Sequence, residues 1–269
     1  MTEFFTFFPR ACLKWLATAL LICPTMAGAT PLRIAYGDSL PPWVFADTDK
    51  GILLDITRAS VEPAGYQVMP VYYPYARRVT AYLNHQVDVV TDITPSMVAK
   101  EGLEGYLSIL FYSYENFAIS LSERHFHFDK IMDLANLKVL SWQGAVNTLG
   151  GEYVEMAHAN PNYTETHNQE NQIKMLYLKR VDVIQMDLQI FKYYRGLVGE
   201  KNIIDTQQAV DMFPLFGKSH CGFLFRSEAA RDAFNQHFEA LKNSAQHEQI
   251  YLKYTPDLLP PEKSTQTIP

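Results

Sequence analysis

The chain has 269 residues, a formal net charge of −6 and 48% hydrophobic residues. The acidic balance argues against nucleic acid as a partner, since phosphate backbones are bound by clustered Lys and Arg side chains. A chain of this length and apolar content can bury one or two hydrophobic cores, so we expect one or two compact domains.

The N-terminal segment is typical of a signal peptide. An apolar run at Trp15–Cys23 follows Arg10 and Lys14 and precedes the small residues 27–29. The run is shorter than the roughly 20 apolar residues of a membrane-spanning helix. We therefore expect residues 1–29 to be removed and the mature chain to begin at about Thr30 in the periplasm. An uncleaved membrane anchor is the alternative.

The cysteine content argues against stabilisation of the mature chain by disulfides. Cys12 and Cys23 lie in the predicted signal peptide, so Cys221 stands alone in the predicted mature chain. A single cysteine forms no internal disulfide, and we expect buried apolar side chains to hold the fold together.

Strands and helices are expected to alternate along the first half of the chain. Periodicity and turn residues predict strands at 32–36, 66–71, 87–90, 107–112 and 116–121, and helices at 52–59, 75–83 and 95–100. Ligands of α/β sheets bind in loops that follow parallel strands. In the first such loop, Pro41 and Pro42 fix the backbone and present Trp43. We interpret Trp43 as a ligand contact, with capping of the first sheet as the alternative.

The second half repeats this alternation. The pattern predicts strands at 137–142, 163–166, 181–186 and 203–205, and helices at 169–179, 188–197, 229–241 and 246–254. Both halves place a helix ahead of an x-Val-Asp-Val sequence, at Gln86–Val89 and Arg180–Val183. This short echo favours two similar lobes.

Polar side chains follow several of these strands. Asp92 and Asp187 come just after predicted strands, where a carboxylate would face a ligand cleft. Asn147 and Thr148 stand at an expected helix N-terminus, where backbone amides bind anions. We interpret all four as ligand contacts, with helix capping as the alternative for Asn147 and Thr148. No catalytic, metal-binding or phosphate-binding motif is present, so we expect no catalytic residue, metal or cofactor.

The order of these signals resembles the extracytoplasmic solute-binding proteins of the amino-acid-uptake type, known as bacterial solute-binding protein family 3. The resemblance covers nearly all of the expected mature chain and rests on short motifs in a set order. These are Leu40-Pro41-Pro42-Trp43, Gly51-Ile52-Leu53-Leu54-Asp55, Pro74-Tyr75-Ala76-Arg77, Thr94-Pro95, Arg180-Val181-Asp182 and Ile250-Tyr251-Leu252-Lys253-Tyr254.

The resemblance implies an α/β fold of the type II periplasmic-binding-protein kind, with two lobes joined by crossover segments near 116–121 and 213–222. Lobe 1 would comprise residues 30–118 and 222–269, and lobe 2 residues 119–221. The resemblance also implies that Tyr75 flanks the ligand and that Asp187 binds its amino group. Core packing is the alternative for Tyr75.

The chain departs from the family at the carboxylate site. The family carries an arginine shortly after Thr-Pro that pairs with the α-carboxylate of the ligand, whereas Met97 stands there in this chain. From charge and position we interpret Arg77, or alternatively Arg78, as a replacement anion contact. Solvated surface arginines are the alternative.

The sequence therefore predicts a periplasmic, monomeric protein without catalytic activity that binds a small polar solute for ABC-type uptake. The solute would be amino-acid-like or a related organic anion, and the membrane partner a permease complex. One alternative is a sensory or accessory protein that acts on a membrane receptor. Another is an exported dehydratase-like enzyme on the same fold, with Asp92 and Asp187 as its acid/base pair.

Overall fold

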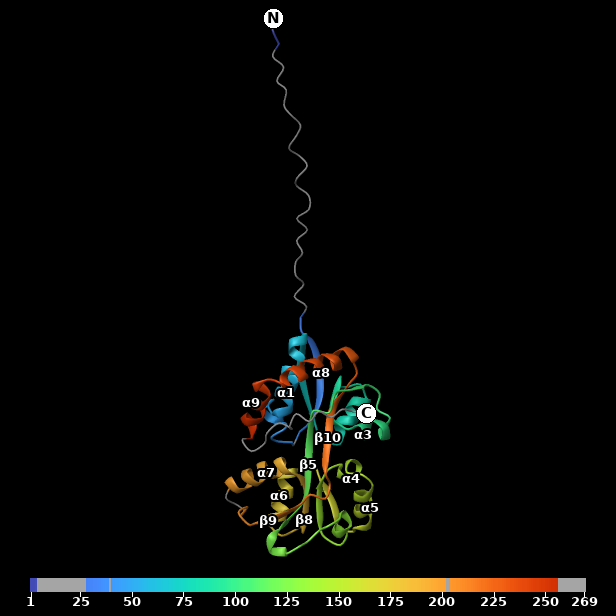
Figure 1. Ribbon diagram of the computed structural model, residues 1–269, viewed down its shortest axis with the longest axis vertical. Helices are drawn as coiled ribbons and strands as arrows, with labels where there is room; N and C mark the ends of the chain where they lie inside the picture. Colours follow the sequence, from blue (N-terminus) through green and yellow to red (C-terminus); the bar gives the residue numbers. More distant parts are fainter. Residues whose placement is uncertain (4–27, 39, 202–203, 256–269) are drawn as a thin grey trace.

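The computed structural model describes residues 1–3, 28–38, 40–201 and 204–255. These residues form two lobes, each built on a β-sheet with flanking helices (Figure 1). The core of the predicted signal peptide, at 4–27, and the tail from residue 256 lie outside the described residues. Within the described ranges, no helix combines the length and the hydropathy needed to cross a membrane.

Five strands form the sheet of lobe 1. They are β1 (Thr30–Gly37), β2 (Tyr66–Tyr73), β3 (Val89–Ile93), β4 (Tyr106–Leu107) and β10 (Lys218–Phe225). β1 lies between β2 and β3 and is parallel to both, while β10 is antiparallel to β3 and β4. All five residues of β3 are buried, as expected of a strand that helices cover on both faces.

Five helices belong to lobe 1. They are α1 (Ile52–Val61), α2 (Arg77–Leu83), α3 (Pro95–Glu101), α8 (Glu228–Lys242) and α9 (Ala245–Tyr254). α1 packs against α8 and α9, and α3 lies on the opposite side of the sheet (Figure 1). α3 begins at Pro95, and the Thr94 hydroxyl caps it by accepting a hydrogen bond of 3.2 Å from the Met97 amide.

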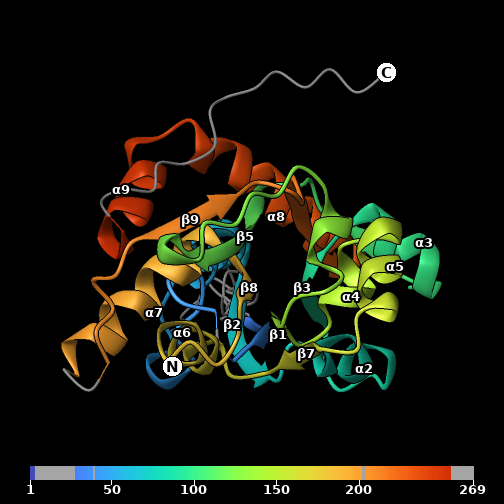
Figure 2. The ribbon, with the colours of Figure 1, turned by 90° about the horizontal axis from the view of Figure 1, so that it is seen from below.

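Lobe 2 has the same plan. Its strands are β5 (Tyr112–Leu121), β6 (Val139–Trp142), β7 (Tyr163–Thr166), β8 (Val183–Asp187) and β9 (Val210–Phe213), and its helices are α4 (Ala145–Thr148), α5 (Gly151–Ala159), α6 (Gln169–Tyr177) and α7 (Leu188–Glu200). β6 lies between its parallel neighbours β7 and β8, and β5 runs antiparallel to β8. Figure 2 shows α6 and α7 on one side of β8 and α4 and α5 on the other.

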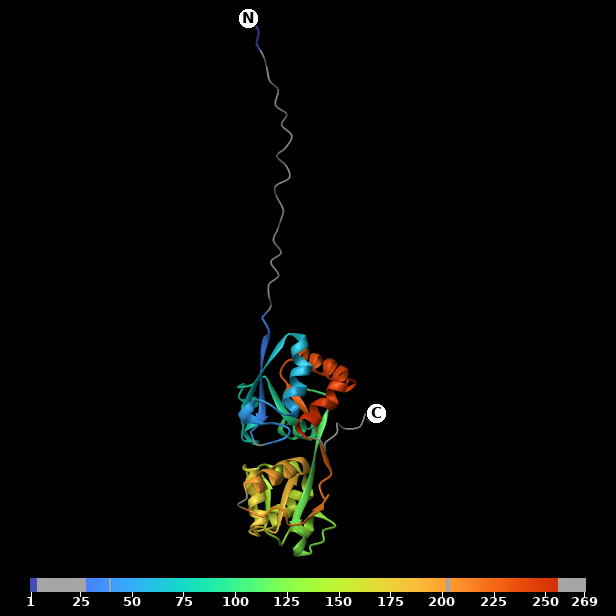
Figure 3. The same ribbon diagram turned by 90° about the vertical axis from the view of Figure 1, so that its left-hand side faces the viewer.

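β5 and β10 connect the lobes. Tyr112–Glu115 of β5 pair with β10, whereas Asn116–Ile119 pair with β8 of lobe 2. The partner of β5 therefore changes between Glu115 and Asn116. The chain returns from β9 to β10, and both connections run along one side of the molecule (Figure 3).

The predicted elements match the observed ones in type and order, with two corrections. The strand expected at 107–112 is interrupted: Leu107 ends β4 and Tyr112 begins β5, while Ser108 and Phe111 between them donate to the backbone of β10 in an irregular path. The expected strand at 203–205 begins outside the described residues, and residues 204–205 form no strand.

Candidate functional site

A cavity lies between the two lobes. It encloses about 650 Å³ of atom-free space, a volume that includes open solvent. Much of its wall comes from residues at the carboxyl ends of strands in both lobes, where α/β sheets bind ligands. The lining residues are Asp38, Leu40, Tyr75, Asp92, Tyr114, Asn116, Trp142, Gln143, Thr148, Thr166, His167, Gln169, Asp187, Ile190, Ser219 and Cys221.

The lobes touch across this cavity. Tyr75 of lobe 1 meets Trp142 of lobe 2 edge to face, with 4.9 Å between ring centroids. Trp43 of lobe 1 donates an indole N–H to Oδ1 of Asp187 in lobe 2 at 3.4 Å. The structure therefore has its lobes in contact, in a closed arrangement.

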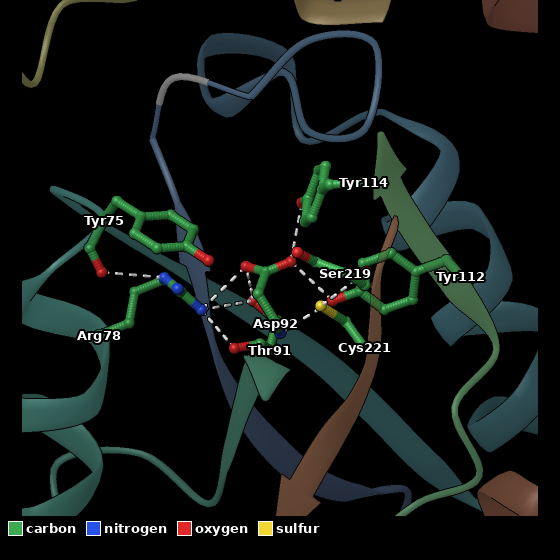
Figure 4. Close-up of polar contacts among 8 residues, drawn as sticks. All are labelled: Tyr75, Arg78, Thr91, Asp92, Tyr112, Tyr114, Ser219 and Cys221. Carbon is green, nitrogen blue, oxygen red and sulfur yellow. Dashed lines mark hydrogen bonds and ion pairs between the residues drawn. The ribbon is translucent and has the colours of Figure 1, made fainter. Parts of the chain in front are cut away.

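A buried ion pair forms part of the lobe 1 wall (Figure 4). Nη1 of Arg78 lies 2.8 Å from Oδ2 of Asp92, and the two side chains are 1% and 0% exposed. Arg78 also donates from Nε to the Tyr75 carbonyl at 3.1 Å and from Nη1 to the Thr91 carbonyl. Burial by itself lowers the pKa of Arg78, but the charge of Asp92 and the surrounding tyrosines raise it above its ordinary value. The guanidinium therefore stays charged.

The other oxygen of Asp92 binds two tyrosines. The hydroxyls of Tyr112 and Tyr114 donate to Oδ1 at 2.6 and 2.8 Å, and the Thr91 hydroxyl donates to Oδ2 at 2.9 Å (Figure 4). Burial, together with the charge of Asp92, raises the pKa of both tyrosines well above the ordinary value, so both remain protonated donors. Asp92 has φ of 56°, in the left-handed region that few non-glycine residues occupy. Its carboxylate is thus fully bound within the protein.

Tyr75 is held from two sides. The guanidinium of Arg78 lies 3.8 Å from the centroid of its ring, and Trp142 contacts the ring from lobe 2. Burial raises the pKa of the Tyr75 hydroxyl. In this closed arrangement Arg78 and Trp142 both contact the Tyr75 ring. The ring is therefore less accessible to a ligand than its expected role as a flanking ring requires.

Asp187 caps a helix and joins the lobes. Its Oδ1 accepts from the amides of Gln189 and Ile190 at 2.9 and 3.1 Å at the start of α7, in addition to the Trp43 indole. Its Oδ2 accepts from the Glu115 amide at 2.9 Å. Burial raises the pKa of Asp187 to about 6, although these hydrogen bonds act in the opposite direction.

A third carboxylate accepts hydrogen bonds from backbone amides at the start of α4. Glu165 accepts from the amide of Gly144 at 2.8 Å and from the amide of Val146 at 3.1 Å. Gly144 lies beside Trp142 and Tyr75 and has φ of 96°, a backbone conformation that favours glycine. The amides of Asn147 and Thr148, which were expected to bind a ligand anion, instead donate to the Gly144 carbonyl at 3.1 and 3.2 Å.

The structure brings four of the seven predicted contact residues to the cavity wall: Tyr75, Asp92, Thr148 and Asp187. Trp43 is 3% exposed and lies behind the wall, where it reaches the cavity through its hydrogen bond to Asp187.

The structure places Arg77 and Asn147 outside the lining, and both are exposed. Successive helical residues point about 100° apart, so Arg77 turns to solvent while Arg78 turns into lobe 1. Asn147 faces outward, and its carbonyl accepts from Lys100 at 3.4 Å. Met97 is buried in an apolar cluster with Tyr82 and Val90.

Several wall residues were not anticipated. Asp38 follows β1 and Trp142 ends β6, so the rule that sites lie at strand ends would have found both. Glu165, in β7 and outside the lining, carries no such signal, because Gly144 and Val146 precede it by about twenty residues and meet it only through the fold.

Comparisons with known proteins address the fold. No family model matches the chain, and no curated protein sequence does. Among solved structures, an ABC uptake transporter substrate-binding protein from Streptococcus pneumoniae with bound histidine is 15% identical, covers 86% of this chain and 94% of its own, and superposes with a TM-score of 0.67. The fold is that of a type II periplasmic binding protein.

Two further structures share this binding-protein fold. The GluR0 ligand-binding core in complex with L-glutamate is 20% identical, with a TM-score of 0.66 over 84% of this chain and 98% of its own. The ancestral amino-acid-binding protein AncCDT-1, described as a precursor of cyclohexadienyl dehydratase, is 17% identical, with a TM-score of 0.63 over 83% of this chain and 95% of its own. These matches confirm the predicted two-lobed α/β fold.

Proposed function

We propose that this protein is an exported solute-binding protein that captures a small polar molecule between its lobes and delivers it to an ABC-type uptake system. The observation that carries the proposal is a cavity lined from both lobes, which two strands connect. Such a connection lets two rigid lobes close on a ligand by hinge motion.

In this proposal lobe 1 comprises residues 30–118 and 222–269, and lobe 2 residues 119–221. Tyr75, Asp92, Thr148 and Asp187 form the polar part of the ligand wall, and Trp43 positions Asp187. Closure is the working step, because the closed state is what a membrane partner distinguishes from the open one.

The fold comparisons support a small-molecule ligand. The similar structures were solved with histidine or L-glutamate bound, as their descriptions state. Their identity to this chain is 20% or less, so their ligands guide the choice of compounds to test.

A thermal-shift screen tests the proposal. A ligand that binds only the folded state increases the free energy of unfolding, by about 2.7 kcal/mol at a ligand concentration one hundred times Kd. The melting temperature rises as a result. The screen covers amino acids, small peptides, amines, carboxylic acids and sugars at millimolar concentration. A saturable rise in Tm with at least one class supports the proposal, and the absence of any shift contradicts it.

The dehydratase-like alternative would use Asp92 and Asp187 as acid and base. Asp92 is bound by Arg78 and two tyrosines, and Asp187 accepts four hydrogen bonds from the protein. Groups committed to such contacts are poorly placed to exchange protons with a substrate. We therefore propose binding without catalysis. A candidate dehydratase substrate that is recovered unchanged after long incubation with the protein would agree with this proposal.

A further inference from the structure

The charges on the cavity wall are unbalanced. Asp38, Asp92 and Asp187 line the cavity, whereas no Lys or Arg of the described residues does. Arg78 lies behind Asp92 and is neutralised by it. A ligand that enters this cavity therefore meets three carboxylates and no Lys or Arg side chain, and the imidazole of His167 is the one basic group among the described lining residues.

The guanidinium and the backbone amides at helix starts that would bind a ligand carboxylate already bind carboxylates of the protein. Three such groups surround the cavity: a guanidinium and two pairs of backbone amides. They belong to Arg78, to Gly144 and Val146, and to Gln189 and Ile190, and their partners are Asp92, Glu165 and Asp187 respectively.

An incoming anion would have to displace these partners. A ligand carboxylate that took Arg78 would leave the carboxylate of Asp92, which is 1% exposed, without its cation. One that took the α7 amides would leave Asp187, which is 4% exposed, without two of its donors. Leaving a buried charge uncompensated is strongly unfavourable.

Asp38 differs from the other wall carboxylates. It is exposed at the end of β1, lines the cavity, and forms no ion pair with any other described residue. The cavity wall also contains the apolar or aromatic side chains of Leu40, Tyr114, Trp142 and Ile190. Aromatic rings attract cations as well as apolar groups.

We propose that the ligand is a small organic amine, protonated at neutral pH, with an apolar body and no carboxylate. Its ammonium group binds Asp38, and its body packs against the aromatic and aliphatic wall. This inference rests on the proposed function, and it names the ligand class that the same site selects. It replaces the amino-acid-like or anionic solute that the sequence suggests.

Matched probes test the inference by calorimetric titration and thermal shift. Phenethylamine, phenylalanine and 3-phenylpropionate share one ring and chain and differ in their charged groups, and agmatine with arginine forms a second pair. We expect both amines to bind at least about tenfold more tightly than the parent amino acids, a difference of about 1.4 kcal/mol. We expect 3-phenylpropionate to produce no shift.

Two variants locate the ammonium group. Asp38→Asn should weaken amine binding about fivefold or more. Asp47 is an exposed carboxylate that does not line the cavity, so the control variant Asp47→Asn should leave amine binding unchanged. Equal or tighter binding of the amino acids or of 3-phenylpropionate would overturn the inference and leave the proposed function standing. Amine binding that is equal in both variants, or no binding of any of these probes, would overturn it as well.

Discussion

Arg78 and Asp92 form an ion pair inside lobe 1, with 2.8 Å between nitrogen and oxygen and at most 1% of either side chain exposed. Asp92 lines the cavity and Arg78 lies behind it, so the positive charge of Arg78 is neutralised within the protein. The two neighbouring arginines therefore differ: Arg78 is buried in an ion pair, whereas Arg77 is exposed.

The first prediction concerns these two arginines. Arg78→Met leaves the Asp92 carboxylate buried without its partner and should lower the free energy of unfolding by about 3–5 kcal/mol. Arg77→Met removes the same charge from an exposed position and should change it by less than about 0.5 kcal/mol. Urea denaturation measures both. Adding Asp92→Asn to Arg78→Met should recover part of the loss, and equal effects of the two arginine variants would refute the assignment.

The second prediction concerns Asp187 and pH. Its pKa of about 6 in the folded protein is above the usual value of about 4, so the folded state binds the proton more tightly than the unfolded state. The stabilisation from this proton is present at low pH and is lost as pH rises from about 4 through 6, by up to roughly 3 kcal/mol.

Asp187→Asn removes this titration, although it also alters the hydrogen bonds at the start of α7 by an amount that does not depend on pH. Urea denaturation at pH 4, 5, 6 and 7 should therefore show the unfolding free energy of the Asn variant improving relative to the original protein as pH rises. A difference that stays constant across this range would show that Asp187 has an ordinary pKa.

The third prediction concerns closure. Trp142 meets Tyr75 across the cavity, and aromatic pairs contribute about 0.5–1.5 kcal/mol. Trp142→Ala should therefore shift the balance between closed and open forms about twofold to tenfold toward open, which small-angle X-ray scattering detects as a larger radius of gyration. Phe126→Ala, which alters a ring packed within lobe 2, is the matched control and should leave the radius unchanged.

Local pattern predicted the order of helices and strands, and the resemblance to a known family implied the two-lobed fold. The buried strand β3 and the capped helix α3 follow from β-branched runs and from Thr94-Pro95. The Val-Asp-Val echo also has a physical basis, because Asp88 accepts from the Arg33 amide and Asp182 from the Lys138 amide at equivalent places in the two lobes.

The site was less predictable, because its contacts join residues that are distant in sequence. Tyr75, Asp92, Thr148 and Asp187 could be found from their positions at strand and helix ends. The choice between Arg77 and Arg78 depended on the rotation of α2 against β3, which the short helical pattern left open. The contact of Glu165 with the Gly144 and Val146 amides has no sequence signature at all.

The claim that the cavity between the lobes is the ligand site is tested most directly by tryptophan fluorescence. Trp142 lines the cavity and Trp43 lies behind its wall. Titration with agmatine, excited at 295 nm, should give a saturable change in emission that Trp142→Phe removes while the rise in Tm persists. Agmatine binding, seen as a rise in Tm, with no change in the emission of the original protein would contradict the account.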